Sequence, residues 1–109
     1  MKQETDSFRL LKPIAAYFAA DSGDAQAVSQ CFTENGTVKD EGHAHKGRAA
    51  IEQWKRDASA KYQYTSEPFA CEEIDGMTIV TSHLIGNFPG SPVDLRFLFQ
   101  LEGDEIESL

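Results

Sequence analysis

The sequence predicts an α+β protein in which a strongly bent, mixed or antiparallel sheet wraps around three N-terminal helices. Apolar residues recur at helical spacing in most of the chain up to Ala60, whereas strand and turn signals dominate from Tyr62 onward. The extended segment from Met77 to Phe88 would be roughly 40 Å long at about 3.3 Å per residue. Because a strand of that length twists and bends, we expect a curled sheet with a concave side.

The first helix is expected over residues 7–21. Leu11, Ile14 and Phe18 recur at helical spacing and define its buried face. Pro13 lies inside this pattern, and proline is tolerated only in the first turn of a helix. The firm part of the helix should therefore begin near residue 12.

Polar residues after this helix predict a stop and a new start. Ser22 and Gly23 end the first helix, and Asp24 can cap the second, because its carboxylate can accept the free N–H groups of the next turn. The second helix is expected over residues 25–31 and the third over residues 48–60. Their inner faces consist of Val28, Cys31 and Phe32 around the second helix, and of Ala50, Ile51, Trp54 and Ala58 in the third.

Extended segments are expected between dipeptides that favour turns. The turns fall at Asn35-Gly36, Glu41-Gly42, Asp75-Gly76, Pro89-Gly90-Ser91 and Gly103-Asp104. The strands between them are residues 37–40, 43–46, 62–74, 77–88, 93–101 and 106–109. Both faces of strand 77–88 are partly apolar, with Val80 and Leu84 on one face and Ile79 and Ile85 on the other. Since an antiparallel sheet usually keeps one face in water, the second apolar face predicts a homodimer formed through the sheet.

Composition limits the class of protein. A chain of 109 residues with 40% hydrophobic residues suffices for one domain, expected over residues 1–109. The formal net charge of −8 disfavours binding to nucleic acid or to an anionic membrane surface. No apolar run approaches the length of about 20 residues that spans a bilayer. The polar opening, Met1 to Ser7, does not resemble a signal peptide, so we expect a cytoplasmic protein.

Cys31 and Cys71 lack the spacing of a zinc or redox motif, and we expect two free, buried thiols. His43 and His45 would share one face of a strand, which is a geometry that can chelate a metal. Because the sequence places no third ligand beside them, we expect no metal site and no cofactor. One of these histidines could instead face the mouth of a pocket as an acid, a base or a hydrogen-bond donor.

Several short segments follow one common pattern. They are Tyr17-Phe18-Ala19-Ala20, Gly23-Asp24, Cys31-Phe32, Gly36-Thr37-Val38-Lys39-Asp40, Lys46-Gly47-Arg48-Ala49-Ala50-Ile51 and the run from Phe88 to Phe97. In this pattern and in the order of its elements the chain resembles the nuclear transport factor 2-like superfamily, specifically its uncharacterised SnoaL-like and ketosteroid-isomerase-like members. The resemblance implies a cone-shaped sheet, a cystatin-like α+β roll, with a pocket at its concave side. It implies no single activity, because this fold carries isomerases, cyclases and non-catalytic modules alike.

The same resemblance suggests catalytic residues. Asp40 matches the general-base aspartate of ketosteroid isomerase, and Tyr17 matches its oxyanion-binding tyrosine. In an enzyme of this type Asp40 would move a proton, while Tyr17 or His45 would hold the developing oxyanion. Each residue also has a structural interpretation: Asp40 as a solvated turn residue and Tyr17 as a core tyrosine with its hydroxyl at the rim.

Asp94 resembles the acidic strand residue of that isomerase, but its register is open by one residue, and one residue flips a side chain to the opposite face. If Leu95 and Phe97 point into the cone, Asp94 and Arg96 point out. We favour the arrangement in which Asp94 and Arg96 both point out and pair with each other on the outer face.

Aromatic and histidine side chains supply the expected walls of the pocket. The predicted substrate-binding residues are Phe18, His43, Trp54, Tyr62, Phe88 and Phe97. The expected ligand is a small apolar or aromatic molecule. Two alternatives remain at this stage: a non-catalytic dimeric module for ligand sensing or protein contact, and a structural partner whose cone is filled.

Overall fold

The computed structural model describes residues 10–21 and 23–109. Its helices are α2 (Lys12–Ala20), α3 (Ala25–Gln30) and α4 (Arg48–Lys61). Its strands are β1 (Phe32–Asp40), β2 (His43–Lys46), β3 (Tyr64–Ile74), β4 (Met77–Gly86), β5 (Val93–Glu102) and β6 (Glu105–Ser108). The predicted start of the first helix before residue 10, the opening residues 1–7 and Ser22 lie outside the described residues.

The three helices begin where local chemistry places them. Pro13 occupies the first turn of α2, as predicted, where its missing N–H costs no helical hydrogen bond. The carboxylate of Asp24 accepts a hydrogen bond from the backbone N–H of Ala27 at 3.0 Å, which confirms it as the N-cap of α3. Gly47, with φ of 91°, precedes α4.

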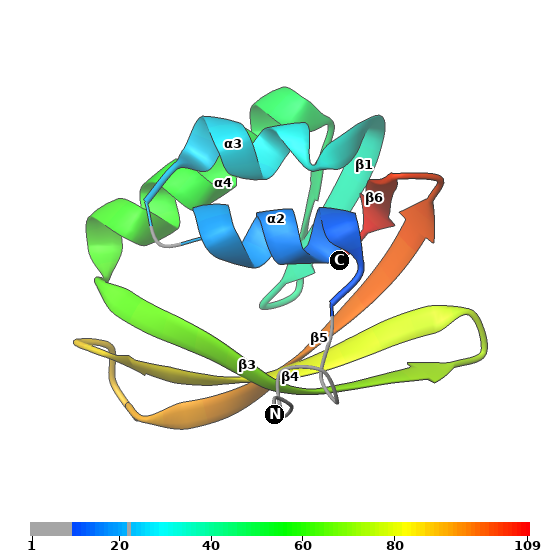
Figure 1. Ribbon diagram of the computed structural model, residues 1–109. Coiled ribbons are helices and arrows are strands. Elements are labelled where there is room, and N and C mark those ends of the chain that lie inside the picture. Colours follow the sequence, from blue (N-terminus) through cyan, green and yellow to red (C-terminus); the bar gives the residue numbers. More distant parts are fainter. Residues whose placement is uncertain (1–9, 22) are drawn as a thin grey trace.

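The six strands form one curled, mixed sheet in the order β2-β1-β6-β5-β4-β3. All neighbours are antiparallel except β1 and β6, which run parallel. Figure 1 shows the helices α2, α3 and α4 on one side of the sheet, with β3, β4 and β5 sweeping beneath them. The fold is therefore the α+β roll that the sequence predicts.

The region around Gly36 differs from the prediction. Asn35 and Gly36 do not form a turn but lie within β1, which begins at Phe32 instead of continuing α3. A Cβ atom at Gly36 would lie 3.0 Å from Cβ of Phe32 and 3.2 Å from the carbonyl oxygen of Ile106. The register against β6 also shifts between Phe32 and Thr37. Gly36 is therefore required by a β-bulge, where a side chain would collide with Phe32 and with the backbone of β6, and not by a turn.

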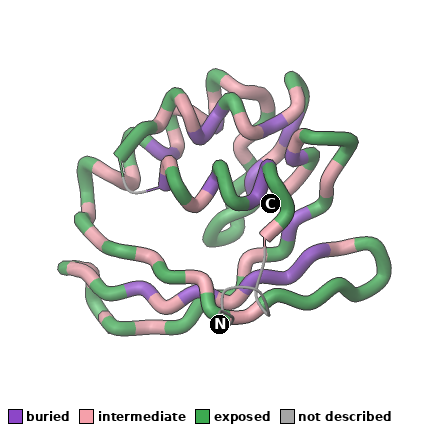
Figure 2. Tube along the Cα trace, in the orientation of Figure 1, coloured by how far each residue is buried: buried purple, intermediate pink, exposed green. Residues whose placement is uncertain are grey.

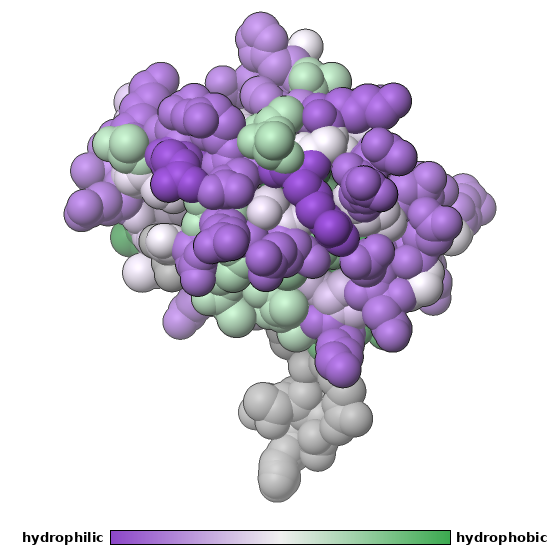
Figure 3. All heavy atoms as spheres, turned by 90° about the horizontal axis from the view of Figure 1, so that it is seen from above, coloured by the Kyte–Doolittle hydropathy of each residue, from purple (hydrophilic) through white to green (hydrophobic). Residues whose placement is uncertain are grey.

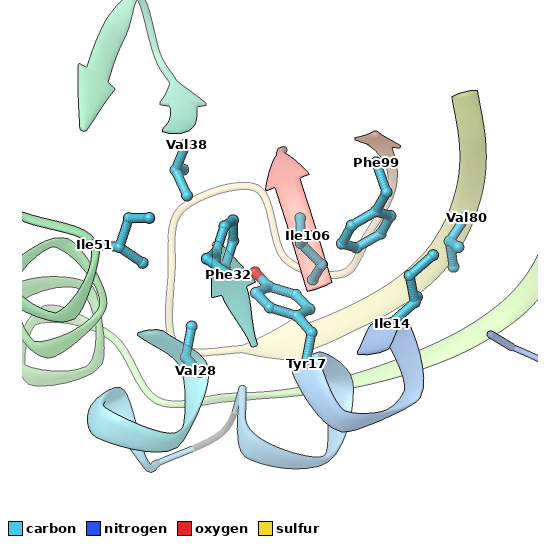
Figure 4. Close-up of a cluster of buried hydrophobic side chains, with 9 residues drawn as sticks. All are labelled: Ile14, Tyr17, Val28, Phe32, Val38, Ile51, Val80, Phe99 and Ile106. Atoms are coloured by element: carbon cyan, nitrogen blue, oxygen red, sulfur yellow. The ribbon is translucent and has the colours of Figure 1, made fainter. Parts of the chain in front are cut away.

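A closed hydrophobic core lies where the helices meet β1, β5 and β6. The cluster consists of Ile14, Tyr17, Val28, Phe32, Val38, Ile51, Val80, Phe99 and Ile106. These side chains point toward one another in Figure 4, and Figure 2 shows the buried stretches along the same contact between layers. Arg48, in the first turn of α4, donates hydrogen bonds to the carbonyl oxygen of Phe32 and to Glu105, so it connects α4 to β1 and β6.

The two cysteines are free, but the prediction that both are buried is wrong. Cys31 is half-buried at the end of α3, whereas Cys71 is exposed. Cys71 lies on β3, which is an edge strand of the sheet, so nothing covers it from that side. Over residues 10–21 and 23–109, no helix has the length and apolar character to cross a membrane.

Candidate functional site

A hollow of about 1030 Å³ opens between the helices and the concave face of the sheet. Its walls come from α2, the end of β1, α4 and the strands β3, β4 and β5. The six aromatic residues among its lining are Tyr17, Trp54, Tyr62, Tyr64, Phe88 and Phe97. A volume of this size fits a small-molecule site, for which several hundred to about 1,000 Å³ is usual.

Asp40 lies at the edge of the hollow, at the last position of β1. Its Oδ2 accepts a hydrogen bond of 3.0 Å from Nε1 of Trp54 on α4. The carboxylate is exposed at the rim, next to the turn, as in the structural interpretation of Asp40. The reason is local: Asp40 pairs with His43 at the β1–β2 turn, where Glu41 and Gly42 both have positive φ and carry the chain outward.

Tyr17 lines the hollow but belongs equally to the core, with 1% of its surface exposed. Its ring packs edge-on against Phe18, Phe32 and Phe99. Burial, reinforced by the carboxylate of Asp21, raises the pKa of the Tyr17 hydroxyl well above its ordinary value. The hydroxyl therefore stays protonated and can act only as a neutral hydrogen-bonding group.

A buried ion pair forms part of the wall, and sequence reasoning missed it. The ammonium of Lys55 on α4 donates a hydrogen bond to Oδ1 of Asp21, which follows α2, and both side chains are only 3% exposed. Lys55 also donates to the hydroxyl of Tyr64 at 2.9 Å, and that hydroxyl donates to Asp21 at 3.2 Å. Asp21 thus has both a cation and a hydroxyl donor beside it, and two of the three N–H groups of Lys55 are used, in line with the rule that buried charges are paired.

Aromatic rings surround the Lys55 ammonium. Its Nζ lies 4.8 Å from the ring centroid of Trp54, 5.6 Å from that of Tyr64 and 5.8 Å from that of Tyr17, all within cation–π range. Burial alone would lower the pKa of Lys55, but the Asp21 carboxylate and the Tyr64 hydroxyl outweigh burial, so this pKa is raised. The lysine is therefore a fixed cation in the wall.

The helical period contains a signal for this pair. Lys55 is four residues after Ile51, so it falls on the inner face that Ile51 and Trp54 define. Asp21 is four residues after Tyr17 and extends the inner face of α2 in the same way. Two opposite charges at interior positions of neighbouring helices predict a buried pair, because neither charge is stable there alone.

The predicted substrate-binding residues divide into two groups. Trp54, Tyr62, Phe88 and Phe97 line the hollow. Phe18 does not, because it packs edge-on against Tyr17, Phe97 and Phe99 and partly fills the core.

Neither predicted histidine is part of the lining. His43 is exposed on β2, and His45 packs on the ring of Trp54 with 6.0 Å between centroids. His45 thus supports Trp54 from outside the hollow. In the part of the chain that the structure describes, no group of three His, Cys, Asp or Glu side chains is placed to hold a metal ion.

The register of β5 places Asp94 on the outer face of the sheet. Phe97 and Phe99 turn inward against α2, and Asp94 alternates with them. Its partner is not Arg96, as predicted, but Nδ1 of His83 at 2.6 Å on the neighbouring strand. The strand register explains this partner. His83 on β4 lies directly opposite Asp94 on β5, so the two side chains share a face and are close, whereas Arg96 belongs to the same strand as Asp94.

Comparison with known structures agrees with this architecture. A protein from Sinorhizobium meliloti that is provisionally described as a polyketide cyclase is 33% identical, with a TM-score of 0.86, over 98% of this chain and 96% of that one. A protein from Catenulispora acidiphila with a ketosteroid-isomerase-like fold, solved with trimethylamine, is 23% identical with a TM-score of 0.75, over 89% and 81% of the two chains. A cystatin-fold protein from Novosphingobium aromaticivorans is 17% identical with a TM-score of 0.72, over 92% and 96%. No family model and no curated protein matches the sequence.

Fold and site together define a curled α+β roll with an aromatic-lined hollow on its concave side. The two more distant neighbours share this fold, and the Sinorhizobium meliloti protein also shares a third of its residues across nearly the whole chain. The chain belongs to the nuclear transport factor 2-like superfamily.

Proposed function

We propose that this protein binds a small apolar or aromatic molecule in the hollow and that Asp40 moves a proton on it, as in isomerases and cyclases. The observation that carries the proposal is the Asp40 carboxylate, held by Trp54 Nε1 at the edge of a hollow with aromatic walls. Apolar walls with few polar groups are typical of small-molecule sites. The position of Asp40 at the rim supports this proposal, because a base there would meet a ligand as it enters.

The chemistry would be proton transfer next to a carbonyl group. Trp54 donates to Oδ2 of Asp40, and Oδ1 has no hydrogen bond from a described residue. Oδ1 can therefore accept a proton from the carbon beside the carbonyl, while the electron pair of the C–H bond moves to the carbonyl oxygen and forms an enolate. Return of the proton to another carbon completes an isomerisation. In a cyclisation the enolate carbon instead forms a bond to a second carbonyl carbon of the same molecule, and the alkoxide that this produces takes the proton back from Asp40.

The relatives support this proposal at the level of reaction class. The Sinorhizobium meliloti protein is provisionally described as a cyclase, and the Catenulispora acidiphila protein as having a ketosteroid-isomerase-like fold. Both descriptions fit acid–base chemistry on a carbonyl compound. They leave the ligand of this protein open.

The test is turnover in a panel of ketones and enones. Asp40→Asn keeps the hydrogen bond from Trp54 within reach but removes the base, so any turnover found should fall by about 100-fold or more with folding intact. Asp104→Asn changes an exposed residue in the turn between β5 and β6, outside the lining of the hollow, so it is the matched control and should keep full turnover. Equal turnover in Asp40→Asn and the unaltered protein would mean that the base is another residue.

The second candidate is a non-catalytic homodimeric module, for which the outer face of the sheet argues. Ile85 and Leu98 on that face are 52% and 43% exposed. The face above the helices, in contrast, is covered mainly by hydrophilic side chains (Figure 3). A dimer formed through the sheet would cover Ile85 and Leu98 and leave the hollow accessible.

Sedimentation velocity at rising concentration tests the dimer. The unaltered chain should sediment as two copies, and Ile85→Glu/Leu98→Glu should sediment as one. A monomer at every concentration would reject this arrangement.

A further inference from the structure

The polar end of the hollow is a buried lysine with one free hydrogen-bond donor. A lysine ammonium has three N–H groups. In Lys55 one donates to Asp21 and another to Tyr64. The third has no acceptor among the described residues, and Lys55 lines the hollow. A buried donor without an acceptor is costly, so an acceptor atom on a bound molecule would lower the free energy of this wall.

The surroundings of Lys55 select the kind of acceptor. The cationic side chains of the lining, Lys39, Lys55 and Arg96, are balanced by the carboxylates of Asp40 and Glu41 and by Asp21 beside Lys55, so these groups together give the hollow no net positive charge to hold a fully anionic ligand. A cationic ligand would meet an aromatic cage that already contains the ammonium of Lys55. A neutral oxygen acceptor, such as a carbonyl, suits both conditions.

The same surroundings exclude Lys55 as an imine-forming nucleophile. Asp21 and Tyr64 raise its pKa, so its nitrogen carries no free electron pair near neutral pH. Lys55 therefore acts as a donor and keeps its proton.

Trp54 links this donor to the proposed base. Its Nε1–H donates to Asp40, and its ring lies 4.8 Å from Nζ of Lys55. A flat aromatic ligand beside Trp54 can thus reach both residues. Tyr17 and His45, the sequence-based candidates for holding an oxyanion, are placed less well. Tyr17 also lines the hollow, but its single O–H is engaged with the Asp21 carboxylate, and His45 is outside the lining.

We propose that Lys55, positioned by Asp21 and Tyr64, donates its third N–H to the carbonyl oxygen of an aromatic or apolar ligand and holds the enolate oxygen formed when Asp40 removes a proton. This assignment rests on the proposed function. It specifies the ligand class as neutral carbonyl compounds and adds Lys55 as the group that recognises their oxygen.

Two probes of the same shape test the assignment by equilibrium dialysis. 2-Acetylnaphthalene carries a carbonyl group, and 2-isopropenylnaphthalene carries a carbon–carbon double bond in its place. The unaltered protein should bind the ketone about tenfold more tightly, the size expected for a charge-assisted hydrogen bond. In Lys55→Met/Asp21→Asn, which removes both buried charges together, the ratio should fall to about one because the ketone alone binds more weakly.

The controls separate Lys55 from its neighbours. Lys46→Met removes an exposed lysine outside the hollow and should keep the tenfold preference. A preference that survives in Lys55→Met/Asp21→Asn but disappears in Tyr17→Phe would overturn the proposal in favour of the tyrosine.

A measurement on the unaltered protein does not depend on any variant folding. The infrared carbonyl band of bound, ¹³C-labelled 2-acetylnaphthalene should move to lower wavenumber than in hexane, because an ammonium donor weakens the C=O bond. An unmoved band, or equal affinity for both probes, rejects the role of Lys55 and leaves the hollow as a binding site. Failure of both probes to bind rejects the proposed function and this inference together.

Discussion

The concave side of the sheet has a closed part and an open part. In the closed part, Phe32, Phe99 and Ile106 meet the helices α2 and α3, and each is fully buried. In the open part, Trp54, Tyr62 and Phe88 face a hollow of about 1030 Å³ and stay partly exposed. Both parts are rich in aromatic rings, so composition does not separate them.

The position of the helices explains the difference. Helices α2 and α3 lie against the side of the sheet formed by β1, β6 and β5, where their apolar faces fill the space (Figures 1 and 4). Toward β3 the sheet curls away, and α4, the end of β1 and Tyr17 of α2 face the hollow that is left. The boundary is Tyr17, which belongs to both parts, and beside it the ion pair of Asp21 and Lys55. The curl of the sheet thus leaves the hollow, and the ion pair of Asp21 and Lys55 makes one part of its wall polar.

The largest expected effect contrasts one phenylalanine from each part. Phe32→Ala should lower the free energy of unfolding by about 3–5 kcal/mol, because it leaves a cavity in closed packing. Phe88→Ala, at the wall of the open part, should cost about 1 kcal/mol. Urea unfolding measures both, and equal losses would contradict the division into closed and open parts.

The buried ion pair should show a smaller loss that a second change recovers. Lys55→Met alone leaves the Asp21 carboxylate buried without its cation, with the Tyr64 hydroxyl as its hydrogen-bond donor, and should destabilise by about 3 kcal/mol. Lys55→Met/Asp21→Asn removes both charges and should recover most of that loss. The double-mutant cycle from urea unfolding gives the coupling. A double variant less stable than the single would show that the pair is favourable in itself.

Alkaline pH should weaken the same region. The pKa values of Lys55, Tyr17 and Tyr64 are raised in the folded protein, above ordinary values of 10.5 for lysine and 10.0 for tyrosine. The unfolded chain releases these protons first, so stability is fully present below about pH 10 and falls as pH rises toward the folded-state values.

Urea midpoints between pH 8 and 11 measure this slope. The slope should be shallower in Lys55→Met/Asp21→Asn, because the Lys55 contribution is gone and Asp21 no longer raises the pKa of Tyr17. An identical slope in both proteins would show that other groups cause the alkaline loss.

The smallest effect concerns a helix end far from the hollow. Asp24→Ala removes the hydrogen bond that the Asp24 carboxylate accepts from the N–H of Ala27 and should lower the free energy of unfolding by about 1 kcal/mol. Asp24→Asn, which keeps an accepting oxygen, is the matched control and should cost less. Thermal unfolding distinguishes the two variants.

Elements with a local cause could be predicted from the sequence. Pro13, Asp24 and the Asp75-Gly76 turn each affect only the backbone within a few residues of their own position, and all three are where expected. The predicted turn at Gly36 was wrong because the need for a glycine at this position comes from close contact with Phe32 and Ile106, and these contacts exist only in the folded protein.

The site could be predicted only where one element carries it. Trp54 and Phe97 follow from the faces of their own helix and strand, and both line the hollow. The pair of Lys55 and Asp21 depends on how two helices meet, and the pairing of Asp94 with His83 depends on a strand register. Period and composition do not fix either one.

Chemical-shift mapping with 2-acetylnaphthalene tests most directly whether the open part is the binding site. The chain has one tryptophan, so the indole N–H of Trp54 gives a single NMR signal. On titration this signal and the backbone N–H of Leu95 should move, while the backbone N–H groups of Phe32 and Ile106 in the closed core should not. Shifts confined to Ile85 and His83 on the outer face, with the Trp54 signal unmoved, would contradict the account.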